Sequence, residues 1–162
     1  MNAPLALSPA ALARIDQALA KYPPDQKQSA VMAALAIAQE EKGWLSVSTM
    51  DFVAQYLEMP PIAVYEVASF YTMYNLKPVG KCKLAICTNL PCALQGANDA
   101  AEHLKKKLGI GFGETTADGA FTLKEAECLG ACGEAPVLLV NDKRMACGMS
   151  AGKLDKLIEE LK

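Results

Sequence analysis

The chain has 162 residues, of which 52% are hydrophobic and 21% are charged, and its formal net charge is -2. This is the composition of an ordinary globular protein, long enough for one domain with a proper core or for two small ones. Binding to nucleic acid normally requires a clear excess of lysine and arginine on one face. The charge balance therefore gives no reason to expect a nucleic-acid partner.

The amino terminus, Met1 to Leu7, carries no positively charged side chain and does not resemble a secretory signal. The apolar run 30–38 is far too short to span a bilayer and is typical of a buried helix. We therefore expect a cytoplasmic protein that is not inserted into a membrane. In a reducing compartment, clustered cysteines bind metal more often than they form disulfides.

Four segments with helical spacing of apolar residues occupy the first half of the chain. Ser8, Asp25 and Ser48 each stand where they would cap the start of a helix. Pro9 suits the first helical position, and Gly43 suits a helix end. The predicted helices cover residues 8–22, 25–43, 48–57 and 62–71.

A polar stretch marked by proline and glycine, residues 75–80, predicts a domain boundary. The elements predicted beyond it are a strand 81–87, a helix 93–108, a strand 121–127, a hairpin of strands 137–140 and 144–147, and a helix 150–161. Counted with the hairpin as one unit, this β-α-β-β-α order is typical of a small thioredoxin-like domain. We therefore predict an α+β protein, with an N-terminal four-helix domain (1–78) and a thioredoxin-like α/β domain (79–162).

Two close cysteine pairs are the strongest chemical signal in the sequence. Cys87 and Cys92 form a C-x4-C pair, and Cys128 and Cys132 form a C-x3-C pair. Each pair follows a predicted strand, at the carboxyl end where sites in such sheets usually lie. Four soft thiolates from two loops suit a tetrahedral zinc ion or an iron-sulfur cluster, and the spacing leaves both open. A thiol redox enzyme is disfavoured because its usual motif is C-x-x-C.

The other candidate residues have simpler interpretations. Cys82 would lie about 16 Å from Cys87 if a strand rises roughly 3.3 Å per residue, so the two sulfurs cannot share a metal. We expect Cys82 and Cys147 to be small buried hydrophobes, and His103 to be a surface or satisfied histidine. The glycines of 109–113 follow a helix and lack the context of a nucleotide-binding turn. No residue is predicted to be catalytic.

Four segments together resemble a known family, the 24-kDa (E) subunit of NADH:quinone oxidoreductase, respiratory complex I. They are 60–74 (PPIAVYEVASFYTMY), 78–81 (PVGK), the pair Cys87-x4-Cys92, and 127–137 (ECLGACGEAPV). That family is similar to thioredoxin-like 2Fe-2S ferredoxins. Residues 143–149 depart from the aromatic and acidic residues expected there.

The resemblance implies that Cys87, Cys92, Cys128 and Cys132 hold one 2Fe-2S cluster. It also implies a partner subunit that carries FMN and the NADH site, other peripheral-arm subunits, and a location at the inner membrane without insertion. The chain would then be part of an oxidoreductase without a complete active site of its own. We expect the helical domain to dock the flavoprotein through the aromatic run 70–74; the alternative is that this run only packs the two halves of the chain together. The equivalent subunit of a soluble NAD-linked formate dehydrogenase or hydrogenase is the alternative, and a zinc interaction module is a further one.

Overall fold

The computed structural model describes residues 7–162, which form two compact units that divide between Pro78 and Val79. The division falls inside the polar stretch 75–80. The expectation about a secretory signal concerns residues that, apart from Leu7, lie outside the described part of the chain. Each unit has its own hydrophobic core and is described by itself.

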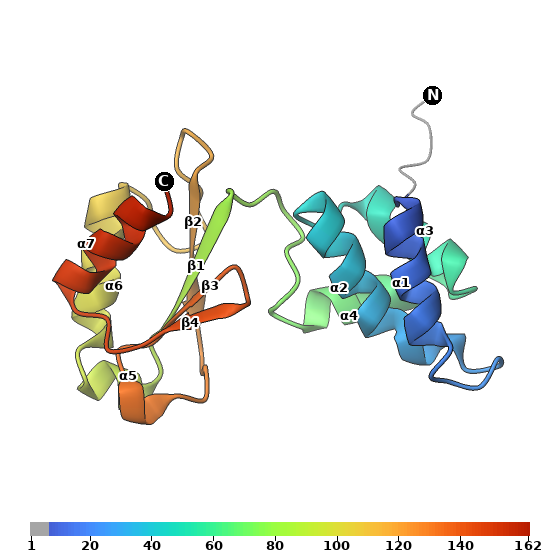
Figure 1. Ribbon diagram of the computed structural model, residues 1–162, viewed down its shortest axis with the longest axis horizontal. Coiled ribbons are helices and arrows are strands. Elements are labelled where there is room, and N and C mark those ends of the chain that lie inside the picture. Colours follow the sequence, from blue (N-terminus) through green and yellow to red (C-terminus); the bar gives the residue numbers. More distant parts are fainter. Residues whose placement is uncertain (1–6) are drawn as a thin grey trace. The chain divides into compact units, whose positions relative to one another are not determined.

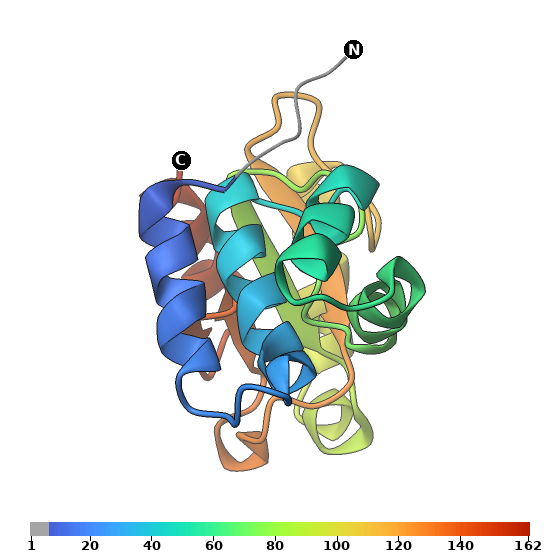
Figure 2. The same cartoon turned by 90° about the vertical axis from the view of Figure 1, so that its right-hand side faces the viewer.

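The first unit, called the helical unit here, contains the four predicted α-helices (Figure 1). They are α1 (Pro9–Leu19), α2 (Val31–Lys42), α3 (Val47–Tyr56) and α4 (Pro61–Phe70), with a 3-10 turn, η1 (Lys27–Ala30), before α2. In Figure 2, α1 and α2 lie side by side. The core between the helices is built from fully buried aliphatic side chains, among them Ile15, Leu35, Leu45, Val53 and Leu57.

The helix starts show where capping was predicted correctly and where it was wrong. Ser8 caps α1, because its hydroxyl accepts a hydrogen bond from the Ala11 amide at 3.2 Å. Ser46, and not Ser48, caps α3 by accepting from the Thr49 amide. Asp25 caps nothing, since the 3-10 turn separates it from α2. The prediction missed Ser46 because Ser48 and Asp51 imitate a capping box two residues further on.

The second unit, called the cluster unit here, contains a four-stranded sheet with the order β2-β1-β3-β4. Its strands are β1 (Cys82–Cys87), β2 (Phe121–Ala126), β3 (Leu138–Val140) and β4 (Arg144–Ala146). The strands β1 and β2 run parallel, whereas β3 is antiparallel to both β1 and β4. The predicted hairpin is confirmed: Asn141 and Asp142 form its turn with positive φ angles, the backbone of a tight hairpin.

Helices cover one face of this sheet, where α6 (Ala97–Leu108) and α7 (Ala151–Glu160) lie next to each other (Figure 1). The predicted single helix 93–108 is wrong, because the structure has a short α5 (Leu90–Leu94) and then α6. Gly96 separates them with a φ of +86°, a conformation that glycine adopts without strain. The break matters for the site, since it places Cys92 within a helical turn and not in a loop.

Among the described residues, no helix combines the length and apolar character needed to cross a bilayer.

Candidate metal centre

The two cysteine pairs follow neighbouring strands. Cys87 is the last residue of β1 and lies opposite Ala126, the last residue of β2. The ladder continues one step further, because the Thr88 amide donates to the Ala126 carbonyl at 3.1 Å. Cys128 follows only two residues after Ala126. The expectation that both cysteine loops lie at the carboxyl ends of adjacent strands is therefore confirmed.

The first pair is buried. Cys87 is 1% exposed and Cys92 is 2% exposed, and both pack against Ala97 and Val137 in a small cluster separate from the main core of the sheet. The Cys87 amide donates to the Val137 carbonyl at 3.0 Å, and its thiol donates to the Glu127 carbonyl at 3.6 Å. These contacts tie the first pair to the segments on both sides of the second one.

The electrostatics of Cys92 show which thiols are neighbours. Burial raises the pKa of the Cys92 thiol to about 11, and hydrogen bonding to the Cys87 thiol adds to this shift. A smaller contribution to the raised pKa comes from the charge of Cys132. Cys87 and Cys132 therefore lie close enough to Cys92 to influence its pKa. Without a cation, the protein favours the neutral thiol at Cys92.

The second pair is exposed. Cys128 and Cys132 lie in the segment between β2 and β3, and Cys132 begins a short 3-10 turn, η2 (Cys132–Glu134). Gly130 lies between them with a φ of +73°, so the chain reverses there as the sequence predicted. Leu129 and Ala131 point the other way and pack against the buried pair. The second pair is thus fixed by its apolar neighbours, while its thiols remain open to solvent.

The donor chemistry of these residues fits an iron-sulfur cluster. In the part of the chain that the structure describes, all six cysteines are free thiols, so none of the four is used in a disulfide. Over residues 7–162, however, no three histidine, cysteine or acidic side chains are already arranged around one metal position. The four sulfurs would therefore have to come closer together to bind one centre. The four-cysteine ligand set stays a prediction.

Two residues assigned simple roles from the sequence behave largely as predicted. Cys82 lies at the opposite end of β1 from Cys87, packs against the core of the sheet, and donates its S–H to the Leu161 carbonyl at 3.7 Å. His103 pairs with Asp155 across α6 and α7, with 2.9 Å between Nε2 and Oδ1. Neither residue lies among the two cysteine pairs.

Cys147 lies closer to the site than expected. It is half-buried and packs against the group formed by Cys87, Cys92 and Val137. A hydrogen bond with the Glu134 side chain raises the pKa of its thiol. The pairing of Leu138 with Ala146 brings the next residue, Cys147, level with Val137. The Asn141-Asp142 turn fixes the pairing of β3 with β4. A register assigned from that turn would have placed Cys147 beside Val137.

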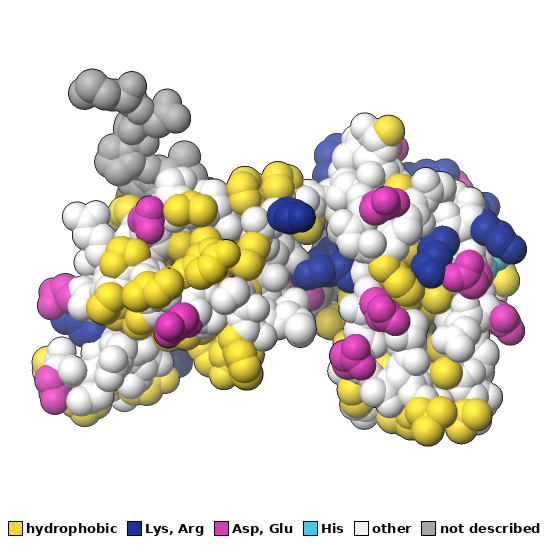
Figure 3. Space-filling model, turned by 180° about the vertical axis from the view of Figure 1, so that it is seen from behind, with side chains coloured by type: hydrophobic (Ala, Val, Ile, Leu, Met, Phe, Trp, Pro, Cys, Tyr) yellow, Lys and Arg dark blue, Asp and Glu magenta, His cyan; other side chains and the backbone are white. Residues whose placement is uncertain are grey.

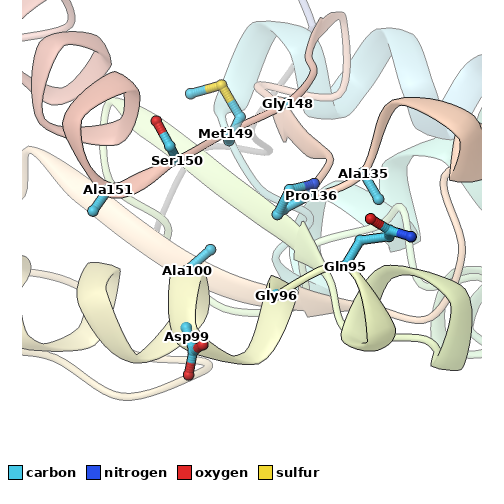
Figure 4. Close-up of a pocket in the computed structure, with 10 residues that line it drawn as sticks. All are labelled: Gln95, Gly96, Asp99, Ala100, Ala135, Pro136, Gly148, Met149, Ser150 and Ala151. Carbon is cyan, nitrogen blue, oxygen red and sulfur yellow. The ribbon is translucent and has the colours of Figure 1, made fainter.

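A cavity of about 320 Å³ lies between the starts of α6 and α7 and the residues that follow η2, Ala135 and Pro136 (Figure 4). Ala135, Pro136, Met149 and Ala100 give it an apolar lining. Its one charged lining residue, Asp99, stands in the first turn of α6, where a phosphate would otherwise be favoured. The cavity therefore offers no attraction to the phosphates of a nucleotide.

Comparison with known families identifies the class of protein. The chain matches the family model of the thioredoxin-like 2Fe-2S ferredoxins over residues 15–162. It belongs to that family. The family match removes the ambiguity between zinc and an iron-sulfur cluster that the cysteine spacing alone had left open.

Individual relatives carry more specific names. The chain is 48% identical over 141 residues to the E subunit of the NADH-quinone oxidoreductase of Rickettsia typhi, covering 86% of this chain and 82% of that one. It is 46% identical to the mitochondrial NADH dehydrogenase [ubiquinone] flavoprotein 2 of Dictyostelium discoideum, covering 81% of this chain and 53% of the relative. The structure of an NAD+-reducing NiFe hydrogenase in the air-oxidized state shares the fold, with a TM-score of 0.68, 24% identity, and coverage of 78% of this chain and 22% of that one.

Proposed function

We propose that this chain is the 2Fe-2S electron-transfer subunit of an NADH:quinone oxidoreductase. Relatives named as a subunit of that complex match most of its length at nearly half identity. The hydrogenase likeness is one of fold, at 24% identity, and does not favour that assignment. Cys87, Cys92, Cys128 and Cys132 would hold the cluster. The observation that carries the proposal is that both cysteine pairs follow adjacent parallel strands, and that Cys87 and Cys92 contact the segment that bears Cys128 and Cys132.

Each part of the site has a distinct task in this proposal. When bound, a 2Fe-2S cluster accepts and returns one electron at a time. Cys87 and Cys92 would supply thiolates from buried positions, which would keep water away from one side of the cluster. Cys128 and Cys132 supply the other two ligands from an exposed loop, which leaves that side accessible to a partner. Ligand thiols lose their protons when a metal binds, so Cys92, whose burial favours the neutral thiol, would have to be deprotonated to act as a ligand.

The chain requires a flavin-bearing partner. NADH gives up two electrons as a hydride, whereas one such cluster takes one, so a flavin must divide the pair. The cavity at the starts of α6 and α7 does not suit the phosphates of a nucleotide, since Asp99 occupies the start of α6 there. We propose an FMN-bearing, NADH-oxidising subunit as the partner, within a peripheral arm of other subunits. The assembly would lie on the cytoplasmic side of the inner membrane.

Purification of the full chain with iron and sulfide tests the cluster directly. We expect a reddish-brown protein with two iron and two sulfide per chain that bleaches partly with dithionite. All-cysteine ligation predicts a midpoint potential on the order of -400 mV. A colourless protein holding one zinc, or a midpoint well above zero, would show that the proposed electron-carrier function is wrong.

The helical unit presents the surface that we propose for docking this partner. Helix α4 has one charged residue, Glu66, and is apolar on both faces. Val64 and Ala68 pack into the core, while other large apolar residues on α4 and just after it are exposed. A helix that is apolar all round is normally covered on all sides. The exposed set, which we call the α4 patch, consists of Ile62, Tyr65, Phe70, Tyr71 and Met73. Figure 3 shows apolar side chains gathered on the helical unit.

The aromatic run 70–74 is divided between the core and the α4 patch. Tyr74 is buried and donates its hydroxyl to the Met32 carbonyl at 2.9 Å, and burial raises the pKa of its phenol to about 12. Tyr71 packs edge-on against the Tyr74 ring, and Phe70 packs edge-on against Tyr71. Phe70 is nevertheless 78% exposed. An aromatic side chain held in place by a buried neighbour is well suited to anchor a protein interface.

Substitution within the α4 patch tests the docking role. Changing Ile62 and Phe70 to serine should weaken binding to the FMN-bearing subunit by about tenfold or more, because two exposed apolar anchors are lost. Val47→Ser is the matched control, since Val47 is an equally exposed apolar residue on α3. Titration by calorimetry would measure both. Equal affinity for the double variant and the native chain would exclude the α4 patch as the docking surface.

A further inference from the structure

A second apolar surface lies beside the cysteine pairs, on α5. Leu90 and Leu94 are 68% and 77% exposed, and they lie one helical turn apart on the same face. Between them is Cys92, which is 2% exposed and is the buried residue of this short helix. In Figure 3, apolar side chains gather at the lower end of the cluster unit, which is the end where α5 lies in Figure 1. The helix thus buries a predicted ligand on one side and presents two leucines to solvent on the other.

Acidic residues surround this end of the cluster unit. Glu125 at the end of β2, Glu127 before Cys128, and Glu134 after Cys132 are all exposed. Glu125 is held at the site, because the hydroxyl of Thr88, the residue after Cys87, donates to its carboxylate at 2.6 Å. We call these three glutamates the acidic rim.

Several lysines of the same unit lie at the other end of the sheet, whereas Lys153, in the first turn of α7, lies beside Gly148 near the cysteines. Lys81 directly precedes β1, and the last turn of α6 carries Lys105, Lys106 and Lys107. Lys143 lies in the turn between β3 and β4, which is next to the start of β1 because the Asn141 amide bonds to the Lys83 carbonyl. The acidic rim therefore gives the cysteine end of the unit a local negative charge.

We propose that Leu90, Leu94 and the acidic rim form the surface through which electrons are exchanged with the redox partner. This inference rests on the proposed function, since it requires the cluster. Electron transfer weakens steeply with distance, so the partner's redox group must approach the end of the unit that carries the cysteines. The occupant is a protein surface with an apolar centre surrounded by lysine and arginine, because apolar centres with charged rims are typical of specific interfaces.

The negative charge of the acidic rim disfavours two other partners for this surface, a second copy of the chain and an anionic membrane. In a two-fold dimer of this chain through the same surface, the acidic rim of one copy would meet the acidic rim of the other. A membrane surface containing anionic lipids would repel the same three glutamates. A basic partner surface is attracted by them, and the attraction also speeds association.

Stopped-flow reduction of the cluster by NADH in the presence of the FMN-bearing subunit tests the proposal. Leu90→Ser combined with Leu94→Ser should lower the second-order rate of cluster reduction by about tenfold. The visible spectrum and midpoint potential should stay unchanged, since neither side chain is buried. Met145→Ser is the matched control, because Met145 is exposed on β4 of the same unit, and its rate should stay within about twofold of the native rate.

Salt dependence provides the second measurement. The native rate should fall as ionic strength rises, and Glu125→Gln combined with Glu134→Gln should flatten that fall. A native rate for the double leucine variant, or dimerisation of the native chain that depends on Leu90 and Leu94, would overturn the docking surface. The proposed function would survive either result if NADH still reduces the cluster through the partner. A native cluster that the partner never reduces would overturn both.

Discussion

The two cysteine pairs have opposite environments although they follow adjacent strands. Cys87 and Cys92 are nearly inaccessible to solvent and belong to a packed group with Ala97 and Val137. Cys128 and Cys132 are exposed, in a segment held by Leu129 and Ala131. The first pair belongs to the strand-helix framework of the domain. The second pair belongs to a loop that covers one side of it.

The difference indicates how a cluster would be assembled and used in this fold. A buried pair is fixed by folding itself, so part of the ordering cost of the metal site is met before the metal binds. An exposed pair leaves an entry route for iron and sulfide, and it also leaves the bound cluster close to the surface. If the four cysteines hold the cluster as proposed, the first pair would provide rigidity and the second pair would provide access for loading and for electron exchange.

Loss of a ligand tests both pairs with the largest expected effect. Cys87→Ser and Cys128→Ser should each abolish the cluster or severely destabilise it, because a soft thiolate ligand is removed. Cys82→Ser and Cys147→Ser are the matched controls and should retain the visible spectrum. Absorbance per chain after reconstitution is the measurement. Loss of colour in Cys82→Ser together with native colour in Cys128→Ser would contradict the ligand assignment.

Thiol alkylation should separate the pairs in the cluster-free protein. At pH 8, Cys128 and Cys132 should react with iodoacetamide at least about tenfold faster than Cys92. Cys92 is buried and its raised pKa, about 11, keeps it in the unreactive neutral form. Mass spectrometry of quenched time points gives the rate at each site. Equal rates at Cys92 and Cys128 would show that the first pair is not held inside the domain.

The free energy of unfolding of the cluster-free protein should respond differently to a substitution in each pair. Cys92→Ser should lower the free energy of unfolding by about 1–3 kcal/mol, because it places a hydroxyl in a buried apolar group. Cys128→Ser should change it by less than about 0.5 kcal/mol, as is usual for exposed positions. Urea denaturation of both variants measures the difference. Similar costs for the two substitutions would mean that the second pair is as well packed as the first.

The sequence predicted the elements well where the signals are local. Ser8 with Pro9 fixed the start of α1, and the Asn141-Asp142 turn fixed the hairpin. The sequence also predicted that both cysteine pairs lie at the carboxyl ends of neighbouring strands. This was possible because β1 ends at Cys87 and β2 ends two residues before Cys128. Signals of this kind depend on a few adjacent residues and do not require knowledge of packing.

The missing details depend on tertiary contacts. The division of helix 93–108 at Gly96 was missed, because an isolated glycine inside an apolar pattern does not show whether the chain must turn there. The unequal burial of the pairs was missed for a related reason. Both are flanked by small and apolar residues, and only the packing of Val137 and Ala97 against the first pair makes them different.

The pH dependence of stability tests the burial of Cys92 in the first pair. Folding raises the pKa of Cys92 from 9.0 to about 11, through burial and then the Cys87 thiol, with Cys132 contributing charge. A group whose pKa is higher in the folded state contributes stability below its unfolded pKa and loses it as the pH rises. The cluster-free protein should therefore lose stability gradually between about pH 9 and pH 11.

Urea denaturation at intervals of pH across this window measures the effect, with Cys92→Ser as the reference that lacks the titrating thiol. The native chain should show a steeper fall than Cys92→Ser. Cys128→Ser, which removes an exposed thiol, should follow the native slope. Parallel slopes for the native chain and Cys92→Ser would mean that Cys92 titrates as an exposed thiol does. The contrast between a buried pair and an exposed pair would then not hold in solution.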